Sequence, residues 1–213
     1  MRLPPRVHRL SIVPPPADVL VAIGIHSNRG HVGILHRREA GGEFHVLHMC
    51  GHEKLKNESL RPASWTFWVS LQLITDEAEQ IAASCRLFDT VTAIPYAFSS
   101  PRGFFNEKMK VNERSGAIGL TCATLVLAVF DVLLIDLVQL DSWPIRSDDS
   151  SRREDIVLQI SAPEPHRTAV LSESSVPQYR PLEVAGAGAR KRYPVHFIKA
   201  LRYSRRIQES WVD

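Results

Sequence analysis

One cysteine occupies a position suited to a sulfur nucleophile. Cys122 follows Gly119 and Thr121 near the start of a long apolar segment, residues 115–140. If Thr121 caps a helix in this segment, the sulfur lies in the first helical turn, where unpaired backbone N–H groups and the helix dipole favour a thiolate. A thiolate attacks the carbonyl carbon of an amide or ester when a neighbouring imidazole takes up its proton. The alternative is a structural role, because cysteine is also a common small apolar residue of protein cores.

Histidines that could handle this proton lie in two strand-like segments. Residues 31–36 (HVGILH) and 44–49 (FHVLHM) are joined by a polar stretch with two glycines, which is typical of a hairpin loop. Alternation of side chains allows His31 and His48 to lie on one face as cross-strand neighbours, and we expect the glycine of the first strand to mark a face where a helix packs closely. His45 points the opposite way and is the competing choice on the second strand.

The other elements of the N-terminal part follow from composition and from capping signals. Thr75, followed by Asp76 and Glu77, is a typical helix start. We therefore expect a buried strand at 19–25, a loop at 50–57, a third strand or irregular buried edge at 65–73, a helix at 75–90 and an irregular connection at 94–114. Together these elements predict an α+β fold, in which a small antiparallel sheet packs on a buried central helix that carries Cys122.

The apolar segment 115–140 is that central helix. Apolar residues fill every face of its helical projection, which predicts burial on all sides. The segment is also long enough to span a bilayer, but it contains Asp131 and Asp136. Each would cost about 2.5–3.5 kcal/mol near a membrane centre, so a helix buried within a soluble protein is the better interpretation.

The composition changes after Leu140. Residues 141–151 are polar and predict a linker, residues 155–160 (DIVLQI) a further strand, and residues 161–189, rich in Pro, Ser, Ala and Gly, a poorly ordered stretch. Residues 190–213 carry seven arginines and lysines before the first acid, Glu209, with Val195, Ile198 and Leu201 at helical spacing behind them. This pattern predicts a basic terminal helix, whose charged face is either simply solvated or binds an acidic partner or a membrane surface.

Composition limits the classes of function. The chain has 213 residues, of which 44% are hydrophobic and 23% charged, and a net charge of +3, so it is an ordinary globular sequence with no expected nucleic-acid partner. Three cysteines without metal-ligand spacing predict neither a disulfide framework nor a metal site, and no cofactor-binding motif is present. The proline-rich start lacks the apolar stretch of a secretory signal, which predicts a cytoplasmic protein or one exported without a cleaved signal peptide.

These pieces define three regions. Residues 1–16 form an extended lead-in, residues 17–140 a core, and residues 141–213 a partly flexible C-terminal extension that ends in the basic helix. HVGIL in a strand, a hairpin into HVLHM, and a later helix that opens with LTCATLV resemble the circularly permuted branch of the papain-like cysteine hydrolases. This branch contains permuted NlpC-type amidases and relatives of lecithin retinol acyltransferase, and the resemblance covers roughly residues 17–138.

The resemblance implies a role for each candidate. Cys122 is the nucleophile, His31 the base and His48 the residue that orients the base, and the reaction is hydrolysis or acyl transfer through a thioester, as in thiol proteases and amidases. The implied substrates are peptides, peptidoglycan or lipid esters, as for a bacterial effector. A non-catalytic adaptor of the same fold, binding a partner through its basic tail, is the alternative.

Overall fold

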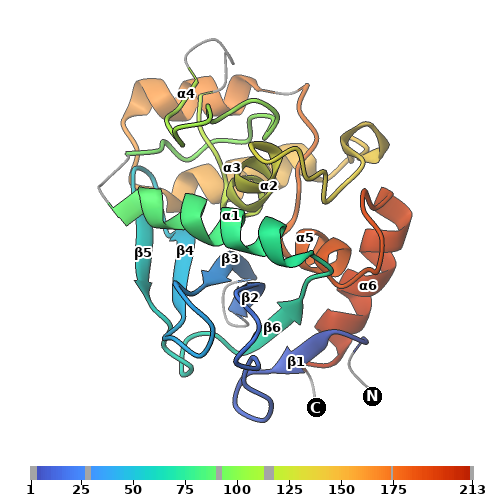
Figure 1. Ribbon diagram of the computed structural model, residues 1–213. Helices are drawn as coiled ribbons and strands as arrows, with labels where there is room; N and C mark the ends of the chain where they lie inside the picture. Colours follow the sequence, from blue (N-terminus) through green and yellow to red (C-terminus); the bar gives the residue numbers. More distant parts are fainter. Residues whose placement is uncertain (1–3, 27–29, 90–92, 113–117, 174, 212–213) are drawn as a thin grey trace.

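A single antiparallel sheet organises the molecule (Figure 1). The computed structural model describes residues 4–26, 30–89, 93–112, 118–173 and 175–211. Within these ranges the sheet has six strands in the order β1-β6-β2-β3-β4-β5. Their bounds are β1 (Val7–Arg9), β2 (Val21–His26), β3 (His31–His36), β4 (His45–Met49), β5 (Leu55–Ser59) and β6 (Phe67–Ser70).

The strands expected at 19–25, 31–36, 44–49 and 65–73 are confirmed as β2, β3, β4 and β6. The loop expected at 50–57 is wrong, because β5 begins at Leu55 and pairs with β4. This strand lies at the edge of the sheet, and its polar sequence, LKNES, lacks the buried residues that marked the central strands. The lead-in is also less irregular than expected, since β1 pairs with β6.

Each face of the sheet has its own hydrophobic cover. Val32 and Ile34 of β3 belong to a large cluster that includes residues of helices α1 (Thr75–Arg86), α2 (Cys122–Asp131) and α5 (Pro181–Gly188). The opposite face carries a smaller cluster built around Leu35, Trp65 and Trp68. The lead-in helps to cover this second face, because the Trp68 indole N–H donates to the carbonyl of Val13. The helix expected at 75–90 is confirmed as α1, with one 3-10 turn (Leu87–Asp89) at its end.

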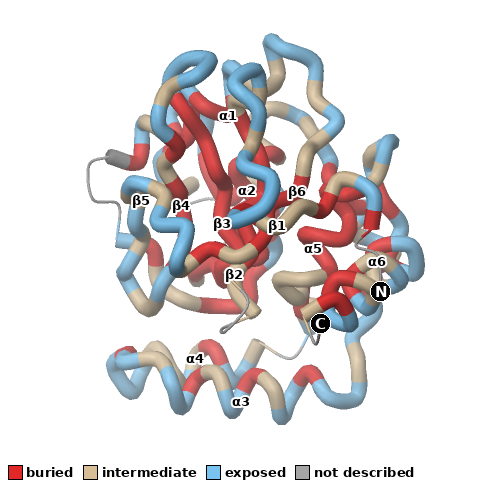
Figure 2. Tube along the Cα trace, turned by 90° about the horizontal axis from the view of Figure 1, so that it is seen from below, coloured by how far each residue is buried: buried red, intermediate tan, exposed pale blue. Residues whose placement is uncertain are grey.

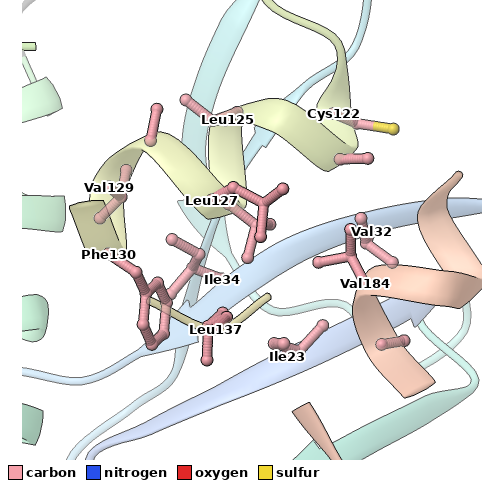
Figure 3. Packing of buried hydrophobic residues seen from close by; sticks show 14 of the residues in the cluster. Ile23, Val32, Ile34, Cys122, Leu125, Leu127, Val129, Phe130, Leu137 and Val184 are labelled. Carbon is pink, nitrogen blue, oxygen red and sulfur yellow. The ribbon is translucent and has the colours of Figure 1, made fainter. Parts of the chain in front are cut away.

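The central helix is real but much shorter than expected. α2 begins at Cys122 with Thr121 as its N-cap and ends at Asp131, and its residues fill the large cluster (Figure 3). The chain then turns through Leu134, which has a positive φ of 57° and is 92% exposed. Val138 forms a parallel bridge with Val195. A continuous apolar run does not separate helix from buried extended chain, so the expectation of one helix over 115–140 was wrong beyond Asp131.

The C-terminal third is helical rather than loosely ordered. It forms α3 (Asp149–Gln159), α4 (Glu164–Ser172), α5 and α6 (Phe197–Glu209). The strand expected at 155–160 is wrong because residues 155–159 lie in α3 and Ile160 is its C-cap. The poorly ordered stretch expected at 161–189 is also wrong for its described residues, 161–173 and 175–189. α4 and α5 carry proline in their first turns, and the small residues of α5 let it pack closely on α6. A Cβ at Gly186 would lie 2.6 Å from the carbonyl oxygen of Ala200 in α6.

The basic terminal helix is confirmed as α6, although its buried side differs from expectation. Ala200, Ser204 and Ile207 face inward, whereas Ile198 is exposed. Helices α5 and α6 both contribute to the large hydrophobic cluster, so these two helices of the C-terminal region share one core with the sheet. Helices α3 and α4 instead lie side by side as a separate pair, mostly exposed on their outer surfaces (Figure 2). No helix in the described ranges is both long and apolar enough to cross a membrane.

Candidate functional site

All three residues singled out in the sequence line one pocket of about 690 Å³. The pocket lies where β3 starts and β4 ends. His31 comes from the first residue of β3, His48 from β4, and Cys122 from the first residue of α2. Residues of α3 line it from the side opposite the sheet. Side chains separated by as many as 91 positions in the sequence therefore share one cavity.

The two histidines are in direct contact. Nε2 of His31 lies 2.9 Å from Nδ1 of His48, within hydrogen-bond distance. Strand register explains the contact. β3 and β4 pair with Leu35 opposite Val46, so continuing the register places Gly33 opposite His48. Because Gly33 has no side chain, the His48 ring can lean diagonally toward His31.

The sequence predicts close packing of a helix at Gly33, but the close neighbour is strand β4. A Cβ at this position would lie 2.9 Å from the Cβ of His48 and 2.9 Å from Val46 Cγ2. Both imidazoles belong to the sheet face that carries Trp65, whose ring centroid is 5.8 Å from that of His31 and 5.2 Å from that of His48. Helix α2 packs on the other face, so the pocket extends around the end of the sheet.

His45 is not part of this arrangement. It pairs with His36 across the strands, and the two rings are 5.9 Å apart. Because neighbouring residues of a strand alternate between faces, His45 and His48 project from opposite faces of β4. The structure therefore brings His48, and not His45, to His31.

A carboxylate that the sequence did not reveal continues the chain of contacts. Oε1 of Glu58, on β5, lies 3.4 Å from Nε2 of His48. Glu58 was missed because residues 50–57 were expected to form a loop, which gave no reason to place the next residues beside His48. LKNES has no apolar alternation that would signal a strand, so only its pairing with β4 reveals Glu58 as a neighbour of His48.

This chain of contacts fixes the proton positions. A carboxylate can only accept a hydrogen bond, so Nε2 of His48 carries a proton and donates it in a hydrogen bond to Glu58. Burial and the neighbouring His31 lower the pKa of His48 to about 4, so its ring is neutral near pH 7 and Nδ1 is an acceptor. His31 then donates from Nε2 to that acceptor. Because Nε2 carries that proton, Nδ1 is the nitrogen through which His31 would act as a base.

Cys122 stands at the N-terminus of α2 as its capping signals predicted. The Thr121 side chain accepts a hydrogen bond from the backbone N–H of Thr124, and the Thr124 hydroxyl oxygen accepts one from the backbone N–H of Thr121. Gly119 makes the entry possible, since a Cβ there would overlap the carbonyl oxygen of Pro95. The sulfur points away from the apolar side chains of α2 (Figure 3).

The protonation of Cys122 differs from expectation. Burial raises the pKa of this thiol to about 11, and hydrogen bonds from the backbone N–H groups of Val32 and Ala123 oppose the rise without reversing it. Helix-start N–H groups thus act on the sulfur as foreseen, but desolvation of the thiolate is the larger effect. The contact with Val32 places the sulfur beside the residue that directly follows His31.

The other two cysteines provide a comparison. Cys50 is exposed and also lines the pocket, where its thiol donates to the carbonyl of Lys54 at 3.0 Å. Cys85 is fully buried in the large hydrophobic cluster, and burial raises the pKa of its thiol. Cys122 is therefore the one cysteine of the described chain that combines a helix N-terminus with access to the histidine-lined pocket.

The site thus combines a thiol at a helix N-terminus with a hydrogen-bonded pair of imidazoles around one pocket. Among the described residues, no three His, Cys, Asp or Glu side chains are grouped as a metal site. Comparison of the chain with protein-family models, curated proteins and solved structures found no match.

Proposed function

We propose that the protein is a cysteine hydrolase or acyltransferase, with Cys122 as nucleophile, His31 as base and His48 as the residue that orients the base. The observation that carries this proposal is the hydrogen-bonded pair of imidazoles in the pocket that also holds the sulfur, which itself contacts the backbone next to His31. The order His, His, Cys along the chain, with the histidines on two strands and the cysteine at a helix start, supports a likeness to the permuted papain-like hydrolases.

The chemistry would proceed through a thioester. The Cys122 sulfur attacks the carbonyl carbon of an amide or ester, and its proton passes to Nδ1 of His31. The N–H groups at the start of α2 hold the oxyanion, and His31 then returns the proton to the departing amine or alcohol. Water, or an acceptor alcohol or amine, next loses a proton to His31 and attacks the thioester, which regenerates the thiol.

The raised pKa of the thiol makes the base essential to this proposal. A thiol with a pKa of about 11 is almost entirely protonated at pH 7.5, so it reacts with alkylating agents only slowly unless an acceptor takes its proton. The proposal thus requires that the reactivity of Cys122 depend on His31 far more than on any other imidazole. This requirement can be measured before the natural substrate is known.

The test uses a Cys50→Ser background, which removes the exposed thiol of the same pocket. We expect iodoacetamide at pH 7.5 to modify Cys122, and His31→Gln to slow that reaction by at least about tenfold, a modest fraction of what general bases contribute. His45→Gln is the matched control, because it makes the same change on the other face of β4, and it should leave the rate unchanged. Peptide mass spectrometry identifies the modified cysteine.

A second readout follows the acyl enzyme itself. p-Nitrophenyl acetate should acetylate Cys122 with release of p-nitrophenolate, and Cys122→Ala should abolish the release while leaving the thermal midpoint nearly unchanged. Slow modification of Cys122 that His31→Gln does not alter, with no acetylation, would contradict the proposal. Such a result would favour the adaptor alternative, for which α6 offers the exposed residues Lys199, Arg202 and Arg205.

A further inference from the structure

Helix α3 brings one positive charge to the pocket. Arg152 lines the cavity together with Cys122 and Tyr96, although it lies 30 residues after the cysteine in the chain. Burial raises the pKa of both Cys122 and Tyr96, and the charge of Arg152 opposes that rise at each of them. The guanidinium is thus close enough for its field to reach the sulfur.

The guanidinium of Arg152 forms no ion pair with a described carboxylate. Among the described residues, Arg152 takes part in no ion pair within 4.0 Å. The nearby arginines contrast with it, since Arg146 pairs with Asp149 and Glu183, and Arg180 pairs with Asp148 and Asp149. Arg153 also has no ion pair among the described residues, but it is buried against the Phe98 ring and does not line the pocket. Arg152 is therefore the arginine of α3 that brings an unpaired charge to the cavity.

The rest of the lining does not cancel this charge. Two acids line the pocket, Glu58 and Asp155. Glu58 already faces His48 and Lys56, at 3.4 and 3.7 Å. Asp155 is an exposed residue on the same helix as Arg152, and Lys54 adds a second lining cation that makes no ion pair in the described chain.

We propose that the substrate carries a carboxylate close to the bond that is cleaved, and that Arg152 binds it on the α3 side of the pocket. This inference rests on the proposed function, because it names the class of substrate for that same site. A guanidinium offers two parallel N–H donors that match the two oxygens of a carboxylate. The site would consequently prefer acidic acyl compounds or peptides with an acidic residue beside the scissile bond over neutral ones.

The experiment compares two alkylating agents that differ in one charge. Iodoacetate and iodoacetamide both form a carbon–sulfur bond with Cys122 and release iodide, but only iodoacetate carries a carboxylate. In the Cys50→Ser background we expect Arg152→Gln to lower the ratio of the iodoacetate rate to the iodoacetamide rate by about two- to fivefold, the range for a solvent-accessible ion pair. Arg152→Lys should retain part of the ratio, since it keeps the charge without the planar fork.

Arg205→Gln is the charge-matched control, because it removes one exposed positive charge on α6, and the ratio should not change. The ratio in the Cys50→Ser background with Arg152 intact should also fall as salt increases, a measurement that does not depend on whether the variants fold. An equal ratio with and without Arg152, or one insensitive to salt, would overturn the inference and leave the proposed function standing. No reaction of Cys122 with either reagent would overturn the proposed function, and the inference with it.

Discussion

At the scale of single residues, the balance between burial and hydrogen bonding decides the protonation of the site. Burial keeps the Cys122 thiol protonated and the His48 ring neutral. The contacts from His31 to His48 to Glu58 then place the proton of the His31–His48 hydrogen bond on Nε2 of His31.

The lowered pKa of His48 has a consequence for stability. Its pKa is about 4 in the folded chain and about 6.5 when unfolded, so between these values the unfolded chain binds a proton that the folded chain does not. Stability from the neutral ring is fully present above pH 6.5 and is lost as the pH falls toward 4. We expect His48→Gln to reduce the loss of unfolding free energy over this range by about 1–3 kcal/mol.

Urea unfolding at a series of pH values from 7 to 4.5 measures this difference. Other histidines with lowered pKa values, such as His8 and His52, remain in both proteins and contribute equally to each curve. Parallel curves for the parent chain and the variant would show that His48 titrates normally.

At the scale of elements, the contact between the histidines depends on a strand without a side chain at Gly33. An added methyl group would lie 2.9 Å from both the Cβ of His48 and the carbonyl oxygen of Leu47. We expect Gly33→Ala to destabilise the fold by about 1–3 kcal/mol and to separate the two rings. Reactivity of Cys122 toward iodoacetamide should therefore fall along with stability.

Gly188→Ala separates the two effects. A Cβ at Gly188 would lie 2.7 Å from Cδ1 of Ile23, in the core on the other face of the sheet. This variant should lose stability without losing Cys122 reactivity, as measured by urea unfolding and labelling on the same samples. If both variants reduced reactivity in proportion to their stability, the geometry of the histidine pair would not be the reason.

The elements also show where the sequence was informative. Alternation in HVGILH and HVLHM predicted both strands and allowed His31 and His48 to share a face, but it left His45 as the competing choice, which only the strand register decides. The cap at Thr121 likewise predicted the first residue of α2. Edge strand β5 and the end of α2 could not be predicted, since a polar five-residue strand and a buried extended run have no period of their own.

At the scale of the whole molecule, a buried polar network secures the α3 end of the pocket to the core. Glu183, on α5, is 2% exposed and accepts hydrogen bonds from Arg146 and from the Trp143 indole N–H. Arg146 also contacts Asp149, at the start of α3. Long-range contacts of this kind explain why α3 and α5 were missed: their residues are ordered by partners far away in the chain, and not by local periodicity.

This network predicts a large effect on stability. Glu183→Gln leaves the mostly buried Arg146 with only one of its two carboxylate partners, Asp149, so we expect a loss of about 2–3 kcal/mol in unfolding free energy. Glu164→Gln is the matched control, because its ion pair with Arg167 is exposed, and it should change stability by less than about 0.5 kcal/mol. Urea unfolding of both variants makes the comparison, and equal small losses would mean that the network does not hold α3 in place.

The position of Glu58 on β5 has one more consequence. β5 is an outer strand, hydrogen-bonded to β4 along one side only. If β5 separated locally from β4, the Glu58 carboxylate would move away from His48 while the remaining strands stayed paired. Either nitrogen of the His48 ring could then carry the proton. The reactivity of the Cys122 sulfur would then depend on the local opening of β5, whose five residues separate at a lower free energy than global unfolding.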